Sequence, residues 1–314
     1  MRIQRDSELR KDSLPVRIFD ISEFSKDNGP GRRAVVYFQG CNIHCKWCHS
    51  PHSQPRTSPL LFNQNNCVKC KRCVAACSRK VHRFEGNKHI VNRALCNQCG
   101  KCIEHCPLSI EGVNGSTLYL PTVTISVSGL FNQIEPYLRL DPNGGITLSG
   151  GEALLQLDAA KELLMNCIDH GYHTAVETSG LLPLSIYAFI QPYVKLWIFG
   201  MRITTGDNTS YYSHINEVLQ YLVKKEANIL PRIPMVPGVF DKDEILVQLK
   251  ELLNRYSIDT VQLLPWNKDF KLYYEKGNLP LSMDTPTPNE IESCEVKITS
   301  FFKQNNIRLY ENRT

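Results

Sequence analysis

Closely spaced cysteines are the strongest chemical signal in this 314-residue chain, which contains thirteen of them. Cys41, Cys45 and Cys48 form a C-x3-C-x2-C loop. Two further runs share the spacing C-x2-C-x2-C-x3-C, and they comprise Cys67, Cys70, Cys73 and Cys77, then Cys96, Cys99, Cys102 and Cys106. Cys167 and Cys294 stand alone. Thiolates at such short spacing are typical of metal sites, which predicts bound iron–sulfur clusters or zinc.

The two four-cysteine runs have the spacing of bacterial ferredoxins that hold two [4Fe-4S] clusters. In that arrangement the fourth cysteine of each run binds the cluster of the other run. The predicted ligand sets are therefore Cys67, Cys70, Cys73 and Cys106 for one cluster, and Cys96, Cys99, Cys102 and Cys77 for the other. A pair of zinc sites is the alternative, and two complete runs of this kind make it the poorer one.

The first group differs because it has only three cysteines. Three thiolates leave one iron of a cubane without a protein ligand, and an open coordination position lets a metal site bind a substrate, as in open catalytic zinc sites. A structural zinc site completed by His44 or His49 has the same spacing and stays open at this point.

Composition limits the class of protein. Hydrophobic residues make up 42% of the chain, which argues against global disorder, and the net charge of +5 is too mild to predict a nucleic-acid partner. No apolar run approaches the roughly 18–20 residues that span a bilayer, and no apolar secretory segment follows the amino terminus. We therefore expect a cytoplasmic protein without a membrane partner, in a compartment where thiols are reduced.

Strand and helix signals alternate on both sides of the cysteine runs. Expected strands cover residues 33–39, 145–149, 172–177, 194–201, 228–236 and 259–264, and expected helices cover 154–170, 183–190, 209–226 and 241–256. Repeated βα units predict an α/β fold with a parallel sheet and functional loops after the strands. Six strands fit a partial (β/α)6 barrel. Residues 52–112 interrupt the alternation, which predicts a ferredoxin-like inserted domain between barrel segments 1–51 and 113–314.

Seven ordered segments resemble the glycyl radical enzyme activating enzymes of the radical S-adenosylmethionine (AdoMet) superfamily. They are NGPGRR at 28–33, FQGC at 38–41, WCHSP at 47–51, GGITLSGGEA at 144–153, TSG at 178–180, RIPMVPG at 232–238 and LLPW at 263–266. Several members of that family carry a ferredoxin-like insertion at this place. The resemblance also implies the partial barrel.

The resemblance implies a reaction and its cofactors. Three [4Fe-4S] clusters and AdoMet would be bound, with AdoMet on the open iron of the Cys41/Cys45/Cys48 cluster. One electron, from a donor such as flavodoxin or ferredoxin, would cleave AdoMet under anaerobic conditions. The resulting 5′-deoxyadenosyl radical would remove a glycine Cα hydrogen from a partner glycyl radical enzyme. A radical AdoMet peptide maturase, and a non-catalytic iron–sulfur electron carrier or redox sensor, are the alternatives.

The resemblance also implies positions that contact AdoMet. Trp47 and His49 would face the adenine, and the loop of Gly150, Gly151 and Glu152 the methionyl amino group. Glu177 suits an ammonium group. Arg232 suits a carboxylate or an ion pair inside the barrel.

The chain departs from the family after the fourth core strand, where Gly200, Met201 and Arg202 replace Asp-x-Lys. Asn267 replaces a histidine. Arg202 keeps the cation, whereas Gly200 supplies no carboxylate for AdoMet or for the family's monovalent cation site. We favour a divergent activase, in which Glu177, Arg202 and Asn267 compensate for the missing family residues of the pocket, over a protein that has lost AdoMet cleavage.

Overall fold

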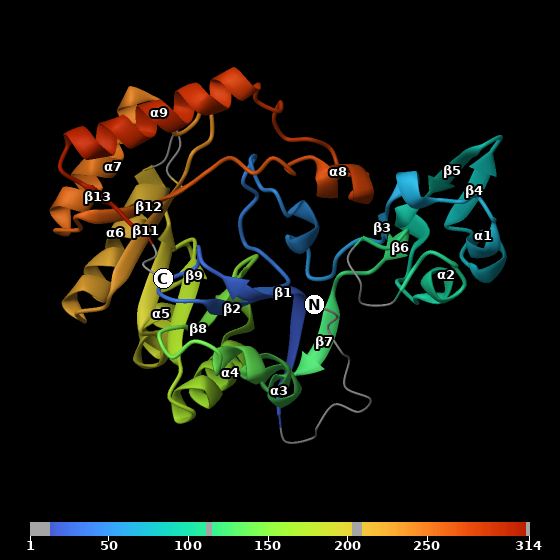
Figure 1. Ribbon diagram of the computed structural model, residues 1–314, viewed down its shortest axis with the longest axis horizontal. Coiled ribbons are helices and arrows are strands. Elements are labelled where there is room, and N and C mark those ends of the chain that lie inside the picture. Colours follow the sequence, from blue (N-terminus) through green and yellow to red (C-terminus); the bar gives the residue numbers. More distant parts are fainter. Residues whose placement is uncertain (1–12, 111–114, 203–208, 312–314) are drawn as a thin grey trace.

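The structure is a computed structural model that describes residues 13–110, 115–202 and 209–311. Figure 1 shows a large α/β body and a smaller lobe beside it. The strands of the body are β1 (Pro15–Ser25), β2 (Arg33–Phe38), β7 (Val123–Ser126), β8 (Gly145–Gly150), β9 (His173–Thr178), β10 (Leu196–Gly200), β11 (Ile229–Pro234), β12 (Thr260–Leu264) and β13 (Arg308–Leu309).

These strands form one sheet in the order β13-β12-β11-β10-β9-β8-β2-β1-β7. All neighbours from β2 to β13 are parallel, whereas β1 pairs antiparallel with both β2 and β7. The six strands predicted from the sequence are β2 and β8 to β12, and the prediction of a parallel sheet is confirmed. The strands β1, β7 and β13 extend it at its two ends and were not predicted.

Helices cover the outer side of the sheet (Figure 1). They are α3 (Val127–Leu138), α4 (Leu157–Asp169), α5 (Leu184–Ile190), α6 (Thr209–Lys224), α7 (Asp243–Arg255) and α9 (Pro288–Gln304), with α8 (Leu272–Gly277) next to the lobe. The apolar stripes of these helices and the outward faces of the strands share one core, in which Trp197, Phe199 and Phe302 are fully buried. This packing leaves the loops after the parallel strands at one edge of the sheet.

The smaller lobe, residues 59–110, is called the cysteine-rich lobe. It contains β3 (Leu61–Phe62), α1 (Arg72–Ala76), the hairpin of β4 (His82–Glu85) and β5 (Lys88–Val91), and α2 (Lys101–Glu104), and β3 pairs with β6 (Leu118–Tyr119). It has a small core of its own around Leu60, Phe62, Val81 and Ile103. Short 3-10 helices cover Pro51–Ser53, Gln64–Asn66, Arg93–Leu95, Ala153–Gln156 and Gln191–Tyr193.

The lobe and the body are joined through α8. Arg93 of the lobe donates to the carbonyl of Lys276 on α8 at 2.6 Å, and a second bond, to the carbonyl of Leu60 at 2.7 Å, holds Arg93 within the lobe. The Lys276 ammonium lies 5.6 Å from the ring centroid of Tyr119 on β6. The lobe is therefore held against the body by specific contacts as well as by the chain.

Candidate active site

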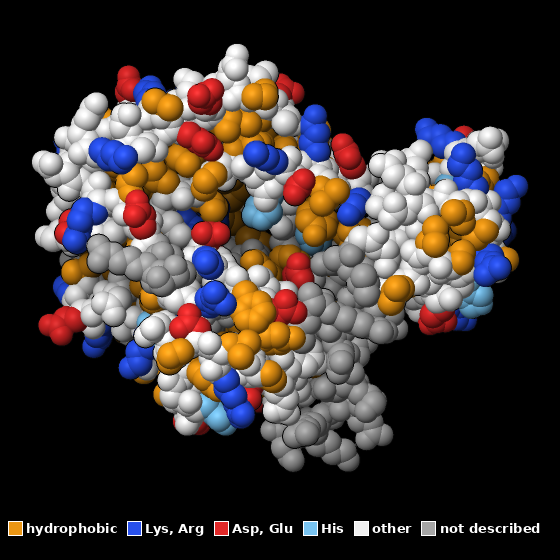
Figure 2. All heavy atoms as spheres, in the orientation of Figure 1, with side chains coloured by type: hydrophobic (Ala, Val, Ile, Leu, Met, Phe, Trp, Pro, Cys, Tyr) orange, Lys and Arg blue, Asp and Glu red, His pale blue; other side chains and the backbone are white. Residues whose placement is uncertain are grey.

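A cavity of about 460 Å³ lies where the parallel strands end. Loops after β2, β8, β9, β10, β11 and β12 all contribute to its wall. Figure 2 shows the molecule hollowed near its centre. This volume falls within the range of about 300–1,000 Å³ that small-molecule sites occupy.

Cys41, Cys45 and Cys48 all line this cavity. Their loop is tied down by backbone hydrogen bonds, from Cys41 N to Gln54 O at 3.0 Å and from Cys48 N to Cys45 O at 3.1 Å. Burial raises the pKa of Cys41 to about 11 and also raises the pKa of Cys48. Free thiols at these positions hold their protons, and a metal must displace those protons to bind. Three thiols lining one cavity fit a cluster with one open iron.

Gly150 and Gly151 bring the loop after β8 against the cysteine loop, and both line the cavity. A Cβ on Gly151 would lie 2.0 Å from the carbonyl oxygen of Gly40, so no other residue fits there without moving the backbone. Gly150 has a φ of +113°, which also favours glycine. The pair is thus required for the close packing of two cavity walls.

Glu152 does not line the cavity. Its side chain is buried and accepts hydrogen bonds from Thr178 Oγ1 at 3.1 Å and from the backbone nitrogen and Oγ of Ser179, both at 2.9 Å. Burial raises its pKa, although these hydrogen bonds oppose that shift. The structure therefore shows Glu152 as a support for the loop after β9, outside the lining of the cavity.

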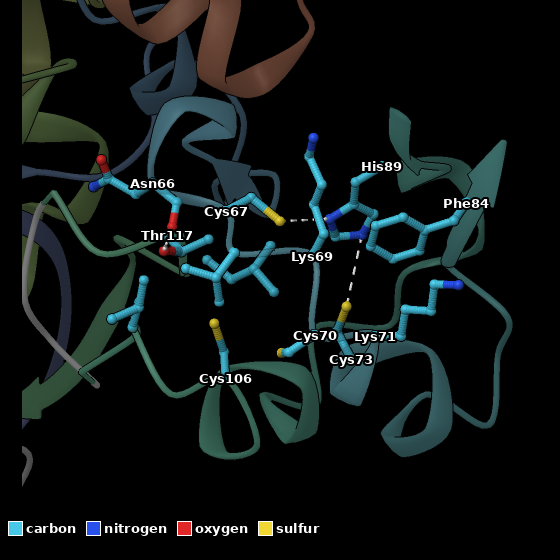
Figure 3. Close-up of a pocket in the computed structure, with 13 residues that line it drawn as sticks. Asn66, Cys67, Lys69, Cys70, Lys71, Cys73, Phe84, His89, Cys106 and Thr117 are labelled. Carbon is cyan, nitrogen blue, oxygen red and sulfur yellow. Dashed lines mark hydrogen bonds between the residues drawn. The ribbon is translucent and has the colours of Figure 1, made fainter. Parts of the chain in front are cut away.

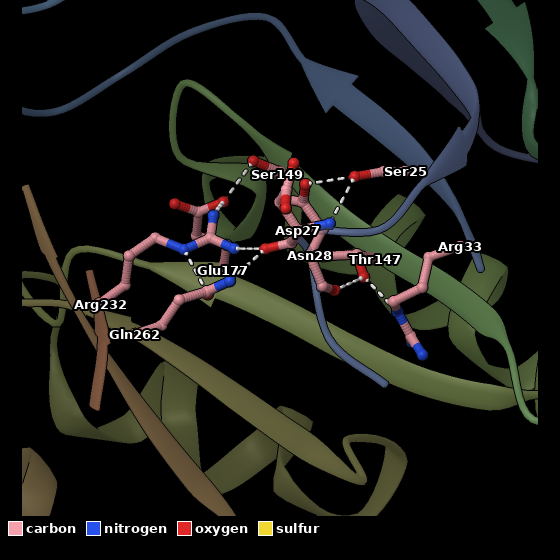
Figure 4. A network of polar contacts seen from close by, with 9 residues as sticks. All are labelled: Ser25, Asp27, Asn28, Arg33, Thr147, Ser149, Glu177, Arg232 and Gln262. Carbon is pink, nitrogen blue, oxygen red and sulfur yellow. Dashed lines mark hydrogen bonds and ion pairs between the residues drawn. The ribbon is translucent and has the colours of Figure 1, made fainter. Parts of the chain in front are cut away.

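Glu177 and Arg232 form a buried ion pair in the cavity wall, 2.8 Å between Arg232 Nη1 and Glu177 Oε2 (Figure 4). Ser149 donates to the same Oε2 at 2.8 Å. Burial alone would raise the pKa of Glu177, but the Arg232 guanidinium and the Ser149 hydroxyl outweigh burial and lower it. Glu177 is thus held ionised.

Arg232 uses its remaining nitrogens within the protein. Its Nε donates to Gln262 Oε1 at 3.0 Å, and its Nη2 donates to the backbone carbonyl of Asp27. Gln262 also donates to that carbonyl, at 2.7 Å. Of the two roles the sequence left open for Arg232, the structure shows the ion pair.

The other expected AdoMet contacts separate into two groups. Trp47, His49, Arg202 and Asn267 line the cavity, and the Trp47 ring packs edge-on against Phe240 at 5.2 Å between centroids. Gly200 and Met201 are not part of the wall, and Met201 is buried in the core. A Cβ on Gly200 would lie 3.3 Å from Arg202 Nη2, so that position adjoins the cavity without facing it.

Several cavity residues were missed in the sequence, namely Ser25, Asp27, Asn28, Tyr37, Ser149, Met235 and Phe270. Asn28 and Ser149 belong to segments that match the family, so their place in the motifs was the available signal. Asp27 accepts hydrogen bonds through its backbone carbonyl, and the residue type at a position does not indicate such a contact. Ser149 matters because it donates a hydrogen bond to Glu177 on β9, the next strand along the chain.

The cysteine-rich lobe has two smaller pockets. Cys67, Cys70, Cys73 and Cys106 line one of them (Figure 3), and Cys77, Cys96, Cys99 and Cys102 line the other. The structure thus groups the fourth cysteine of each run with the first three of the other run. Lys69 and Lys71 in one run, and Gln98 and Gly100 in the other, have positive φ, so the same turn recurs. Such turns direct backbone N–H groups toward an anion and fit an anionic cluster.

Comparisons with known proteins agree with both parts of this geometry. Residues 59–108 match the model of the family described as a 4Fe-4S dicluster domain. The chain is 33% identical over 266 residues to the choline trimethylamine-lyase activating enzyme of Oleidesulfovibrio alaskensis, covering 80% of this chain and 83% of that protein. The chain belongs to the glycyl radical enzyme activating enzymes.

Other members of this family are similar over the same extent. An isethionate sulfite-lyase activating enzyme from Oleidesulfovibrio alaskensis is 31% identical, covering 80% of this chain and 83% of that protein. The trans-4-hydroxy-L-proline dehydratase activating enzyme of Clostridioides difficile is 29% identical, covering 82% and 87%. Members of this family are radical AdoMet enzymes. None of the helices in the described residues combines the length and apolar character that crossing a bilayer requires.

Proposed function

We propose that this activating enzyme reductively cleaves AdoMet and removes a glycine Cα hydrogen from a partner enzyme, leaving a glycyl radical. The observation that carries this proposal is that Cys41, Cys45 and Cys48 all line the 460 Å³ cavity. A [4Fe-4S] cluster held by these thiolates would supply the electron and an open iron for AdoMet.

The surrounding side chains suit the two ends of an amino acid. Both hydrogen bonds to Glu177 fall on Oε2, which leaves Oε1 to accept from an ammonium group. Arg202 lines the cavity, and its guanidinium has the fork geometry that suits a carboxylate. Trp47 and Phe270 provide apolar surface for an adenine, and Asn267 a polar group for a ribose hydroxyl.

We further propose that the sheet is a partial (β/α)6 barrel and that residues 52–112 are an inserted domain with two [4Fe-4S] clusters, making three in all. The match of residues 59–108 to a dicluster domain supports this proposal. The inserted clusters would relay electrons from a flavodoxin or ferredoxin, or shape the docking of the partner. The partner would be a glycyl radical enzyme, and its identity sets the metabolite.

The decisive experiment uses the full chain, reconstituted anaerobically and assayed for iron and sulfide. With dithionite and AdoMet it should form 5′-deoxyadenosine, and without dithionite it should not. A preparation with its clusters filled that forms no 5′-deoxyadenosine contradicts the activase proposal and favours the electron carrier or redox sensor.

The peptide maturase alternative has less support. Such proteins usually carry extra cysteines after the barrel, and here only Cys294 lies there. Cys294 is buried within α9 at 1% exposure and packs in the main core. Its position suits a core residue and no cluster.

A further inference from the structure

Two buried histidines of the β4–β5 hairpin lie among the lobe cysteines, and the cluster assignment does not use them. His82 and His89 are 2% and 6% exposed, and His82 Nδ1 is 3.1 Å from His89 Nε2. The His89 ring stacks on Phe84 at 4.5 Å between centroids and meets Phe62 edge-on at 4.6 Å. Aromatic packing on two sides fixes the orientation of this imidazole.

His89 faces two thiols of a single ligand set (Figure 3). Its Nδ1 lies 3.5 Å from Cys67 Sγ, and its Nε2 lies 3.6 Å from Cys73 Sγ. His82 lines the other pocket, the one shared by Cys77, Cys96, Cys99 and Cys102. The histidine pair therefore forms part of the partition between the two pockets of the lobe.

We propose that His89 donates an N–H···S hydrogen bond from Nδ1 to the Cys67 thiolate, and that His82 is a positioning residue that holds His89 in this tautomer. The pair then makes the reduction potential of the cluster at Cys67, Cys70, Cys73 and Cys106 less negative. This inference rests on the proposed cluster assignment of the lobe, and it is independent of AdoMet cleavage.

The contacts select the tautomer. A neutral imidazole has one N–H and one lone pair, and a thiolate bound to iron can only accept. If Nε2 of His89 carried the proton, the Nδ1 lone pair would face the Cys67 thiolate without a donor. With the proton on Nδ1, Cys67 receives a hydrogen bond and Nε2 accepts from His82 Nδ1–H. Of the two neutral tautomers, this one gives both nitrogens of His89 a compatible partner, because Nε2 lies nearer to His82 Nδ1, at 3.1 Å, than to the Cys73 sulfur, at 3.6 Å.

A hydrogen bond to a ligand sulfur stabilises the extra electron of the reduced cluster, because it offsets negative charge on the thiolate. The second set of cysteines has different donors. There the backbone nitrogens of Val81 and Gln98 lie 3.4 Å from Cys77 Sγ and Cys96 Sγ, respectively. A substitution at His89 should consequently move the potential of one cluster of the lobe and leave the other in place.

The test is a redox titration of the full reconstituted chain, followed by electron paramagnetic resonance, with iron and zinc measured on each preparation. His89→Phe should lower the reduction equilibrium constant of one lobe cluster at least tenfold, about 59 mV for a one-electron couple. His89→Asn should stay close to wild type, because its amide nitrogen is the same number of bonds from the backbone as Nδ1.

The same logic applies to His82, whose donor is also Nδ1. His82→Phe should lower the same potential by less than His89→Phe does, and His82→Asn should preserve it. Arg83→Gln is the matched control, because Arg83 pairs with Glu85 on the exposed side of the same hairpin, at 3.0 Å. It should change neither potential.

Four results would overturn the proposal. If all clusters are present and His89→Phe changes the reduction equilibrium constant by less than twofold, the hydrogen bond is refuted while the cluster assignment stands. Equal shifts in His89→Asn and His89→Phe would show a packing effect. Zinc in place of iron would mean a metal at Cys73, His82 and His89, whose ligand atoms lie within 4.8 Å of one another. A wild-type lobe without clusters would refute the cluster assignment as well.

Discussion

The cavity of the body and the pockets of the cysteine-rich lobe both present cysteine thiols, but in different numbers and surroundings. In the body, three thiols share a wall of about 460 Å³ with charged and polar side chains. In the lobe, four thiols line each small pocket together with apolar residues such as Phe84 or Leu120. Three ligands beside a large cavity suit the binding of a substrate to iron, whereas four ligands around a small pocket suit storage of an electron.

The two regions also differ in how far their ion pairs are exposed to water. In the cavity wall, Glu177 and Arg232 pair with side-chain exposures of 15% and 5%. In the lobe, the pair of Arg83 and Glu85 has exposures of 61% and 62%. The cavity depends on buried charges that need partners, and the lobe keeps this pair in water. Substitutions matched across the two regions can therefore test the division of roles.

Removal of one thiol from each region should have the largest effect. Cys45→Ala should reduce 5′-deoxyadenosine formation with dithionite to the level of cluster-free protein, because the cavity cluster loses one of three ligands. Cys99→Ala should lose iron from the lobe and keep most of this activity, since dithionite can reduce the cavity cluster directly. Product chromatography and iron analysis measure both. Equal loss in the two variants would break the comparison.

Removal of one guanidinium from each region should have the second largest effect, on stability. Arg232→Met should destabilise the protein by about 3–5 kcal/mol, because it leaves the Glu177 carboxylate buried without its partner. Arg83→Met should cost less than about 1 kcal/mol, because its pair is exposed. Denaturant unfolding under anaerobic conditions measures both values. If the Arg232 variant unfolds like the Arg83 variant, the buried pair contributes no more than a surface one.

The stability that Glu177 contributes should depend on pH. Its pKa is lowered in the folded protein, so its contribution is complete above the unfolded pKa of about 4.3 and declines as the pH falls through the folded pKa. The difference in unfolding free energy between wild type and Glu177→Gln should be constant near neutral pH and shrink below about pH 4. Glu85→Gln is the control from the lobe. A constant Glu177 difference down to about pH 3 would contradict an ionised, paired carboxylate.

The smallest effect is expected where the cavity departs from its family. Gly200→Asp places a carboxylate next to Arg202, and its Cβ would lie 3.3 Å from Arg202 Nη2 and from the Thr178 carbonyl oxygen. The stability cost should be about 1 kcal/mol. AdoMet affinity, measured by equilibrium binding, should be unchanged or higher than for the Gly200→Ala control. A large loss would mean that Gly200 does not align with the family's aspartate.

Much of the fold could be predicted from local patterns. The six parallel strands each have a run of apolar residues, and the helices between them have apolar residues at helical spacing. The antiparallel strand β1 was missed, although Val16 and Ile18 are fully buried in it. Its place between β2 and β7 depends on partners from distant parts of the chain, and the two-residue β13 has too little pattern to detect.

The sequence by itself determined which cysteines belong together, because ligands a few residues apart must share one loop, and it determined the family through ordered motifs. Only the tertiary structure decided how individual polar groups are used. It turned Glu152 toward Ser179, committed Arg232 to Glu177, and set His89 against Cys67. Such contacts join residues on different strands and loops. Their directions follow from packing in three dimensions, which spacing along the chain does not encode.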